Sequence, residues 1–232
     1  MNEEQPEPAE FDRFADNYDQ LHAQSLGASG EGPEYFAEYK ARCLERFGVA
    51  PGSQILDYGC GVGNLTKHLA LRSARVFGYD PSSASIDRAR VQVPGATFCT
   101  DPEALPHDAF DAIVLANILH HVPPSERSQL VARLVPLLVP GGRLFVFEHN
   151  PYNPLARRSV ALCAFDIDVI LLSPGEVRRL LRDASLVERR QAYIVFFPRL
   201  LAALRFLEPA LGWLPAGAQT LTLGARPGRG ES

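Results

Sequence analysis

The sequence predicts an α/β fold, a doubly wound and mostly parallel sheet with helices on both faces. Two observations predict it. Between residues 54 and 148, short apolar segments with strand character alternate with segments of helical periodicity. A glycine cluster joins the first of these strands to the helix that follows it. Strands that alternate with helices form βαβ units, and their right-handed crossovers leave few topologies.

Each element can be placed from its pattern. Strands are expected at residues 54–58, 75–79, 96–99, 110–116 and 143–148. Helices are expected between them at 64–71, 82–91 and 125–139. Ser82 or Ser83 is the expected N-cap of the second helix, and Pro140-Gly141-Gly142 is expected to stop the third. The second half predicts a serine-capped helix at 173–184, a strand within 186–197 and a last strand at 219–225.

Composition and charge exclude several classes of protein. The chain has 232 residues, 46% hydrophobic and 22% charged, with a net charge of −4. A fully disordered or fibrous chain is excluded, and the lack of a basic excess does not favour a nucleic-acid partner. No run is apolar enough for a transmembrane segment. A polar, acidic start and well-separated cysteines without a CxxC pair predict a cytoplasmic protein with reduced thiols.

The strongest local signal is the glycine cluster. Gly59, Gly61 and Gly63 follow the strand at 54–58, where glycines permit a tight turn and let a ligand approach the backbone. The next helix points free N–H groups at the same place. Asp80 ends the following strand, where a carboxylate can accept both hydroxyls of a ribose. These features predict a nucleoside-binding loop, the alternative being a tight turn without a ligand.

The loop spacing and one further carboxylate indicate which nucleoside is bound. A dinucleotide site has the pattern G-x-G-x-x-G, whereas the third glycine here comes one residue early. Asp57 precedes the loop and is expected to face the ligand. Its carboxylate would repel a pyrophosphate and attract an ammonium group. An amino-acid nucleoside therefore fits better than NAD.

These residues resemble the class I S-adenosylmethionine-dependent methyltransferase superfamily. The motifs that carry the resemblance are ILDYGCGVGN, VFGYDPS, FCTDPEALP, FDAIVLANILHHV and LVPGGRLFVFEHN. It extends over residues 11–226. The resemblance implies a seven-stranded Rossmann-like sheet that ends in an antiparallel hairpin, and S-adenosyl-L-methionine as the cofactor. It does not select an acceptor.

The resemblance also implies a domain organisation. Residues 11–48 would form an N-terminal helical cap, and residues 49–225 the cofactor-binding domain. Within that domain, residues 151–172 and 198–217 would be insertions on the acceptor side. Residues 1–10 and 226–232 are poor in apolar side chains, and we expect them to be a disordered leader and tail.

The resemblance assigns cofactor-binding roles position by position. Asp57 and the glycine loop would surround the methionine part, Asp80 would hold the ribose, and Asp101 would accept from the adenine amino group. Lys40, on a helix expected at 34–47, would pair with the cofactor carboxylate or else be a solvated surface charge. The implied set is Tyr18, Lys40, Asp57, Gly59, Cys60, Gly61, Asn64, Asp80, Pro81, Thr100, Asp101, Pro102 and Asn117.

Three histidines are candidates for the chemistry. Methyl transfer is an in-line displacement that depends on positioning, and a hydroxyl acceptor benefits from a general base with a pKa near neutrality. His120 and His121 follow the fourth strand and His149 follows the fifth, at the edge where acceptors bind. Each would act as a base, contact the acceptor, or only satisfy backbone groups. No metal-ligand spacing is present, so no metal is expected.

The leading prediction is a methyltransferase that uses S-adenosylmethionine and a small-molecule O-, N- or C-nucleophile. The alternatives are an RNA or protein methyltransferase and a cofactor-binding regulator without turnover. Residues 198–217 carry an apolar stripe that predicts core packing or a homodimer contact. An acceptor lid and a membrane-surface patch are the other options for it. Arg157 and Arg158 are either solvated cations or ligands of an acidic acceptor.

Overall fold

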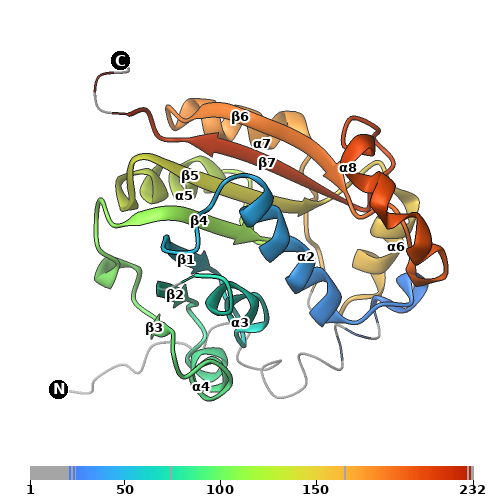
Figure 1. Cartoon of the computed structure of the whole chain (residues 1–232), viewed down its shortest axis with the longest axis horizontal. Coiled ribbons are helices and arrows are strands. Elements are labelled where there is room, and N and C mark those ends of the chain that lie inside the picture. The colour runs from blue at the N-terminus through green and yellow to red at the C-terminus, as the bar shows by residue number, and fades with distance from the viewer. Residues whose placement is uncertain are drawn as a thin grey trace.

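A seven-stranded sheet forms the centre of the molecule. The computed structural model describes residues 21, 23, 25–73, 75–164, 166–228 and 230, so the predicted leader and Tyr18 lie outside the described residues. The strand order is β3-β2-β1-β4-β5-β7-β6 (Figure 1). Strands β1 to β5 are parallel, and β7 pairs antiparallel with both β5 and β6. The predicted α/β fold, with its antiparallel C-terminal strand, is confirmed.

The elements follow the order that the sequence predicts. The strands are β1 Gln54–Tyr58, β2 Arg75–Tyr79, β3 Thr97–Cys99, β4 Phe110–Ala116, β5 Leu138–His149, β6 Val187–Ile194 and β7 Gln219–Ala225. The α-helices are α2 Pro33–Arg46, α3 Asn64–Ala70, α4 Ser83–Gln92, α5 Arg127–Leu134, α6 Pro154–Leu162, α7 Pro174–Asp183 and α8 Glu208–Leu211. Short 3₁₀ helices lie at Gly27–Ser29, Pro102–Ala104, Leu119–His121, Val135–Leu137 and Arg199–Leu207.

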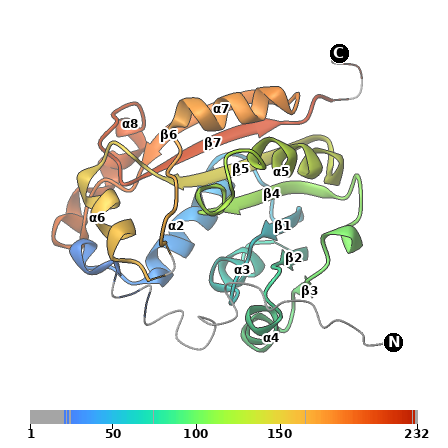
Figure 2. The same ribbon diagram turned by 180° about the vertical axis from the view of Figure 1, so that it is seen from behind.

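Alternation along the strands builds a core on each face of the sheet, because successive side chains point to opposite faces. In β4, Val114 packs in the cluster that includes α2 and α3, and Ile113 packs in the cluster that includes α5 and α7. In β5, Phe145 packs in the cluster with α2 and α3, and Leu144 packs in the cluster with α5 and α7. Figures 1 and 2 show these two pairs of helices on opposite faces. Ligand access remains at the carboxyl ends of the parallel strands.

The serines expected to cap helices do so. The Ser82 hydroxyl accepts from Ser85 N at the start of α4, at 3.0 Å. Ser173 and Glu176 form a reciprocal capping box at the start of α7, where Pro174 occupies the first turn. Each cap satisfies an otherwise unpaired helix N–H. The cap at Ser82 also fixes the direction in which the chain leaves β2.

The helix predicted at 125–139 is wrong at its carboxyl end. Helix α5 stops at Leu134, a 3₁₀ turn follows, and β5 already begins at Leu138. Pro136 contributes to the early stop, because it has no N–H to donate to a helical hydrogen bond. The expected stop signal at 140–142 instead lies within β5. There the register with β4 shifts between Phe110 and Ala112.

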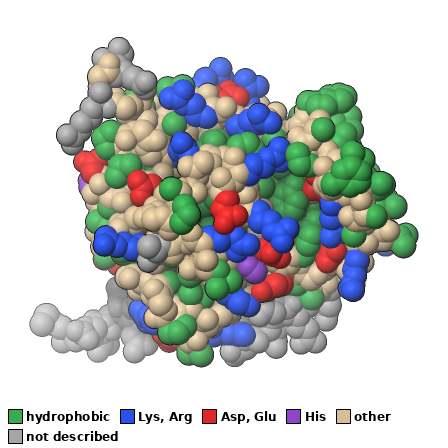
Figure 3. Space-filling model, in the orientation of Figure 1, with side chains coloured by type: hydrophobic (Ala, Val, Ile, Leu, Met, Phe, Trp, Pro, Cys, Tyr) green, Lys and Arg blue, Asp and Glu red, His purple; other side chains and the backbone are tan. Residues whose placement is uncertain are grey.

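The segment at residues 198–217, the apolar segment, lies mainly on the surface. It forms the 3₁₀ helix Arg199–Leu207 and α8. Leu200 is 93% exposed, and Phe206 and Trp213 are each 75% exposed. Core packing, one of the two expected roles, therefore does not hold for these side chains. Figure 3 shows hydrophobic side chains gathered on this side of the molecule. Within the described residues, none of the helices has the length and apolar character needed to cross a membrane.

Candidate active site

The glycine loop turns sharply at the end of β1. Gly59, Gly61 and Gly63 have φ values of 78°, 53° and 92°, a left-handed backbone that glycine adopts without steric cost. The N–H groups of Gly59 and Cys60 both donate to the Tyr79 carbonyl, at 2.7 and 2.9 Å. A Cβ on Gly59 would collide with the Ile118 side chain. The loop is thus held between the ends of β2 and β4.

Asp80 ties this loop to the end of β2. Its Oδ2 accepts from Gly61 N and its Oδ1 accepts from Ser82 N, both at 2.9 Å. The side chain is buried but also lines a cavity together with Gly59 and Gly61. The backbone donors fix the carboxylate at the mouth of the loop, the position that the sequence predicts for it.

A buried pair of opposite charges lies behind the loop. Asp57 is 1% exposed and accepts from the Thr66 hydroxyl at 2.7 Å. Burial raises the pKa of Asp57 to about 7, while the Thr66 hydrogen bond opposes the rise. Burial likewise lowers the pKa of Lys40 to about 8, although Asp57 and Glu148 favour its charged form. Lys40 is 6% exposed, so it is not the solvated surface charge that one expectation allowed.

Two cavities adjoin the loop. The main cavity has a volume of about 380 Å³, and the small cavity has about 80 Å³. Lys40 and Asp57 line the small cavity, whereas Asp80 lines the main one. Gly59 and Asn117 line both. The two cavities therefore flank the same glycine loop, one at the charge pair and the other at Asp80.

Asn117 lies where β4 ends. Its backbone has a φ of 61°, and its N–H donates to the Phe147 carbonyl at 2.8 Å. Its Oδ1 is buried and has no hydrogen-bond partner among the described residues. A buried acceptor without a donor is costly unless a ligand or water satisfies it. This oxygen is therefore available to a donor group of a bound molecule.

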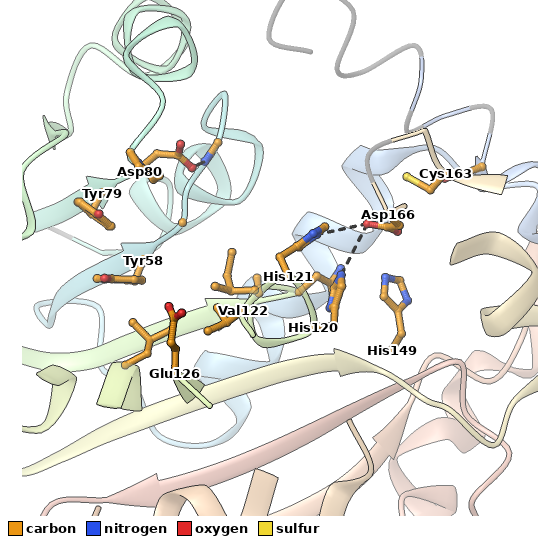
Figure 4. A pocket seen from close by; sticks show the side chains of 18 of the residues that line it. Tyr58, Tyr79, Asp80, His120, His121, Val122, Glu126, His149, Cys163 and Asp166 are labelled. Atoms are coloured by element: carbon orange, nitrogen blue, oxygen red, sulfur yellow. Dashed lines mark hydrogen bonds and ion pairs between the residues drawn. The ribbon is translucent and has the colours of Figure 1, made fainter. Parts of the chain in front are cut away.

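His120, His121, His149 and Asp166 line the far end of the main cavity (Figure 4). Together with Glu148, which contacts His120 from behind, we call them the histidine cluster. Nδ1 of His120 donates to Oε2 of Glu148 at 2.6 Å, and both side chains are almost fully buried. Nε2 of His120 and Nε2 of His121 lie 3.6 and 3.2 Å from Oδ1 of Asp166. The His149 ring lies 5.3 Å from that of His120, centre to centre.

The carboxylates control the charge of this cluster. Burial acts to lower the pKa of His120, but Glu148 and Asp166 outweigh burial and raise that pKa to about 9. Burial acts to raise the pKa of Asp166, but the adjacent imidazoles of His120 and His121 hold that pKa well below its usual range. His120 is therefore held between two carboxylates, which makes it a poor general base at neutral pH.

The three residues predicted to surround the adenine lie outside both cavities. Thr100, Asp101 and Pro102 are exposed at the end of β3 and do not line either cavity. Asp101 Oδ1 accepts from Glu103 N at 2.9 Å and caps the short helix Pro102–Ala104. The adenine role implied for these three residues stays a prediction.

Other predicted cofactor residues lie around the loop. Pro81 lines the main cavity. Asn64 lines the small cavity and its Oδ1 accepts from Gln92 Nε2 at 3.1 Å. Cys60 lines the small cavity too, but most of its side chain packs with Ile86 of α4. The loop therefore gathers these residues, although their contact with a cofactor remains a prediction.

Sequence reasoning missed Asp166. It lies in the predicted acceptor-side insertion at 151–172, but no motif singles it out, and spacing along the chain did not show that it meets His120 and His121. Tyr58 and Tyr79, which line the main cavity with their rings 4.4 Å apart, were not identified either. Both tyrosines are last residues of strands, so the rule about carboxyl ends could have found them.

Known proteins resemble this chain in sequence. Residues 55–142 match the methyltransferase domain family. An uncharacterized methyltransferase of Geobacillus sp. (strain WCH70) is 31% identical over 147 residues, 62% of this chain and 67% of the relative. The ubiquinone biosynthesis O-methyltransferase of Coxiella burnetii (strain Dugway 5J108-111) is 38% identical over 118 residues, 48% of this chain and 50% of the relative. The chain spans about half to two thirds of the curated relatives it matches.

Solved structures share the fold. An S-adenosylmethionine-dependent methyltransferase from Mesorhizobium loti superposes with a TM-score of 0.60 at 23% identity, covering 82% of this chain and 98% of the other. Magnesium protoporphyrin IX methyltransferase from Synechocystis PCC 6803 with bound SAH superposes with a TM-score of 0.64 at 18% identity. The match covers 93% of this chain and 95% of the other. The chain belongs to the class I S-adenosylmethionine-dependent methyltransferase superfamily.

Proposed function

We propose that this chain transfers the methyl group of S-adenosylmethionine to a small molecule bound in the main cavity. The observation that carries the proposal is the lining of this cavity. Gly59, Gly61 and Asp80 contribute to one end of it and the histidine cluster to the other. A nucleoside held at the loop and an acceptor held at the histidines would thus share one cavity, as an in-line displacement requires.

The residues around the loop fit the cofactor. Asp80 presents a carboxylate at the loop mouth, suited to ribose hydroxyls. Lys40 and Asp57 present opposite charges in the small cavity, suited to the carboxylate and the ammonium of the methionine part. Asn117 adds an unpartnered buried oxygen between the two cavities. When bound, the cofactor supplies an electrophilic methyl group on a sulfonium with a good leaving group.

His149 and His121 are the residues we propose to contact the acceptor. Both line the main cavity and both are partly exposed there. An oxygen or nitrogen acceptor must lose a proton as it is methylated, and a nearby imidazole can receive it. His120 is instead a positioning residue, because it is buried and held between Glu148 and Asp166. It orients its neighbours at the wall of the cavity.

The size of the cavity favours a small acceptor over a macromolecule. A volume of about 380 Å³ lies within the range of small-molecule sites, which is roughly 300–1,000 Å³. The net charge of −4 also gives RNA little attraction. The chain's resemblance to a relative named ubiquinone biosynthesis O-methyltransferase supports phenolic acceptors as the first class to test.

The test is methyl transfer from radiolabelled S-adenosylmethionine to a panel of phenols, hydroxy acids and amines. We expect turnover with at least one acceptor class, and a loss of about 10²–10⁴ in kcat for His149→Ala with little change in cofactor affinity. His107→Ala, a change on the exposed surface, is the matched control. Cofactor binding without transfer to any acceptor would favour the regulator, and transfer only to RNA or protein would favour the macromolecular alternative.

A further inference from the structure

Three ligand-type atoms converge at the far end of the main cavity. Nε2 of His120 and Nε2 of His121 face the same oxygen, Oδ1 of Asp166, at 3.6 and 3.2 Å (Figure 4). The three groups offer one atom each, and these atoms all lie within 4.8 Å of one another. Two imidazoles and one carboxylate form the ligand set of many transition-metal sites that keep open positions.

The distances between these atoms suit a shared metal ion. Zinc and similar ions bind imidazole nitrogen at about 2.0–2.1 Å and carboxylate oxygen at about 2.0–2.2 Å. Ligand atoms on one such ion are therefore separated by roughly 3–3.5 Å. The gaps to Asp166 are close to this range. The third gap, between the two imidazole nitrogens, is no more than 4.8 Å.

One of these atoms lacks a partner. Nε2 of His120 is buried and makes no hydrogen bond among the described residues, and the side chain is 1% exposed. Burying a polar atom without a hydrogen bond costs free energy. Since Asp166 lies 3.6 Å away, beyond hydrogen-bond distance, the ion pair with it does not satisfy this nitrogen.

The group behind His120 is also suited to a metal ligand. Glu148 accepts from Nδ1 of His120 at 2.6 Å and from Leu119 N at 2.8 Å. A carboxylate that holds one ring nitrogen fixes the tautomer and makes the other nitrogen a better ligand, as at many zinc sites. Glu148 therefore leaves Nε2 as the coordinating atom of His120.

We propose that His120 Nε2, His121 Nε2 and Asp166 Oδ1 bind a divalent first-row transition metal ion, with its open positions toward the main cavity. The ion would also balance the two carboxylates of the histidine cluster. If the proposed function is correct, an oxygen of the acceptor takes an open position, which lowers the pKa of an acceptor hydroxyl and aligns it with the methyl donor. His121 then serves as a ligand of the ion, and His149, which also lines the cavity, receives the hydroxyl proton. Acceptors with two adjacent oxygens would then be favoured.

Metal binding is tested without cofactor or acceptor, so its failure is distinct from failure of the proposed function. The protein is stripped with a chelator and titrated with Co²⁺, which is followed by visible absorption. Binding of Zn²⁺ is measured separately by equilibrium dialysis. We expect one ion per chain. His121→Ala and Asp166→Asn should abolish this binding, and Glu148→Gln should weaken it about 10–100-fold.

Matched controls and a second measurement keep the test decisive. Asp168→Asn and His107→Ala change exposed residues of the same types and should bind the ion as the wild type does. Anomalous scattering from wild-type crystals soaked in Co²⁺ locates the ion without any variant. No stoichiometric binding, an ion bound elsewhere, or unchanged binding in correctly folded His121→Ala and Asp166→Asn would each overturn the site. The cluster would then be a network of ion pairs.

Discussion

His120 and Glu148 form a buried hydrogen bond of 2.6 Å at the carboxyl ends of two neighbouring strands. Glu148 is in β5, and His120 lies in the short helix that follows β4. The same carboxylate accepts from Leu119 N, so one side chain fixes the backbone and the imidazole beside the main cavity. The same hydrogen bonds therefore stabilise the carboxyl end of the sheet and hold the candidate site in place.

Glu148→Ala should lower the free energy of unfolding by about 3–5 kcal/mol, because it leaves a buried imidazole and a buried N–H without their acceptor. Urea denaturation followed by circular dichroism measures the loss. Glu188→Ala is the control, since the pair of Glu188 with Arg178 is partly exposed and should contribute only about 0–1 kcal/mol. Equal losses in the two variants would contradict a special role for the buried pair.

Asp80→Ala should weaken binding of S-adenosylmethionine by about 1.5–3 kcal/mol, the range for hydrogen bonds to a charged group. Titration calorimetry measures the change in Kd. Asp87→Ala alters an exposed carboxylate on α4 that pairs with Arg90, and it should leave Kd unchanged. If Asp80→Ala binds the cofactor as tightly as the wild type, Asp80 is not the ribose ligand.

Cofactor affinity should rise with pH up to about pH 7. Burial raises the pKa of Asp57 to about 7, so the carboxylate that is to meet the ammonium group is protonated below that pH. Affinity should fall about tenfold for each pH unit below the pKa. Calorimetry between about pH 5.5 and 7.5 measures this slope. The groups that act on the pKa of Asp57 are Lys40, Thr66 and Asp80.

The same shift predicts the sign of a stability change. Because the pKa of Asp57 is higher in the folded chain than in the unfolded chain, its contribution to stability is present below about pH 4 and is lost as pH rises through about 7. Asp57→Asn should remove both pH dependences. Asp111→Asn, at the opposite end of the sheet where Asp111 accepts from Gln54 N, should keep them. A pH-independent Kd in the wild type would show that Asp57 does not meet the ammonium.

Gly59→Ala should destabilise the chain and abolish cofactor binding. The left-handed backbone at Gly59 costs an alanine about 1–2 kcal/mol, and its Cβ would press against Ile118. Gly52→Ala is the matched control, because Gly52 has open space around it and no positive φ. Thermal unfolding and cofactor titration of both variants measure the effects. Normal cofactor binding by Gly59→Ala would show that the loop tolerates a side chain.

The apolar segment should be a contact between two copies of the chain. Leu200 and Phe206 are highly exposed, and apolar side chains in an exposed group mark interaction surfaces. Sedimentation equilibrium should give a dimer for the wild type and a monomer for Leu200→Ser with Phe206→Ser. Unfolding free energy of the separated monomer should change by no more than about 0.5 kcal/mol. A wild-type monomer would leave a lid or a membrane-surface patch as the role of this segment.

Much of the fold could be predicted because strands carry a local signal. The bounds of β1, β4 and β7 agree with the predicted ranges 54–58, 110–116 and 219–225. Their alternating or continuous apolar patterns follow directly from burial on one face or both. The predicted helix at 125–139 extends too far, because Pro136 lies before the turn signal at 140–142 and helix α5 already ends at Leu134.

The cofactor end of the site was predictable and the acceptor end was not. The glycine loop, Asp57 and Asp80 belong to one strand-turn-helix unit and the strand beside it, so the sequence determines them through backbone conformation and the topology of parallel strands. Only the tertiary structure brings Asp166 against His120 and His121. The segment that follows α6 is tied to this place because Ile170 N donates to the His120 carbonyl at 3.3 Å. His120 and His121 are distant from Asp166 in the sequence, and a local pattern of residues cannot predict a contact between distant segments.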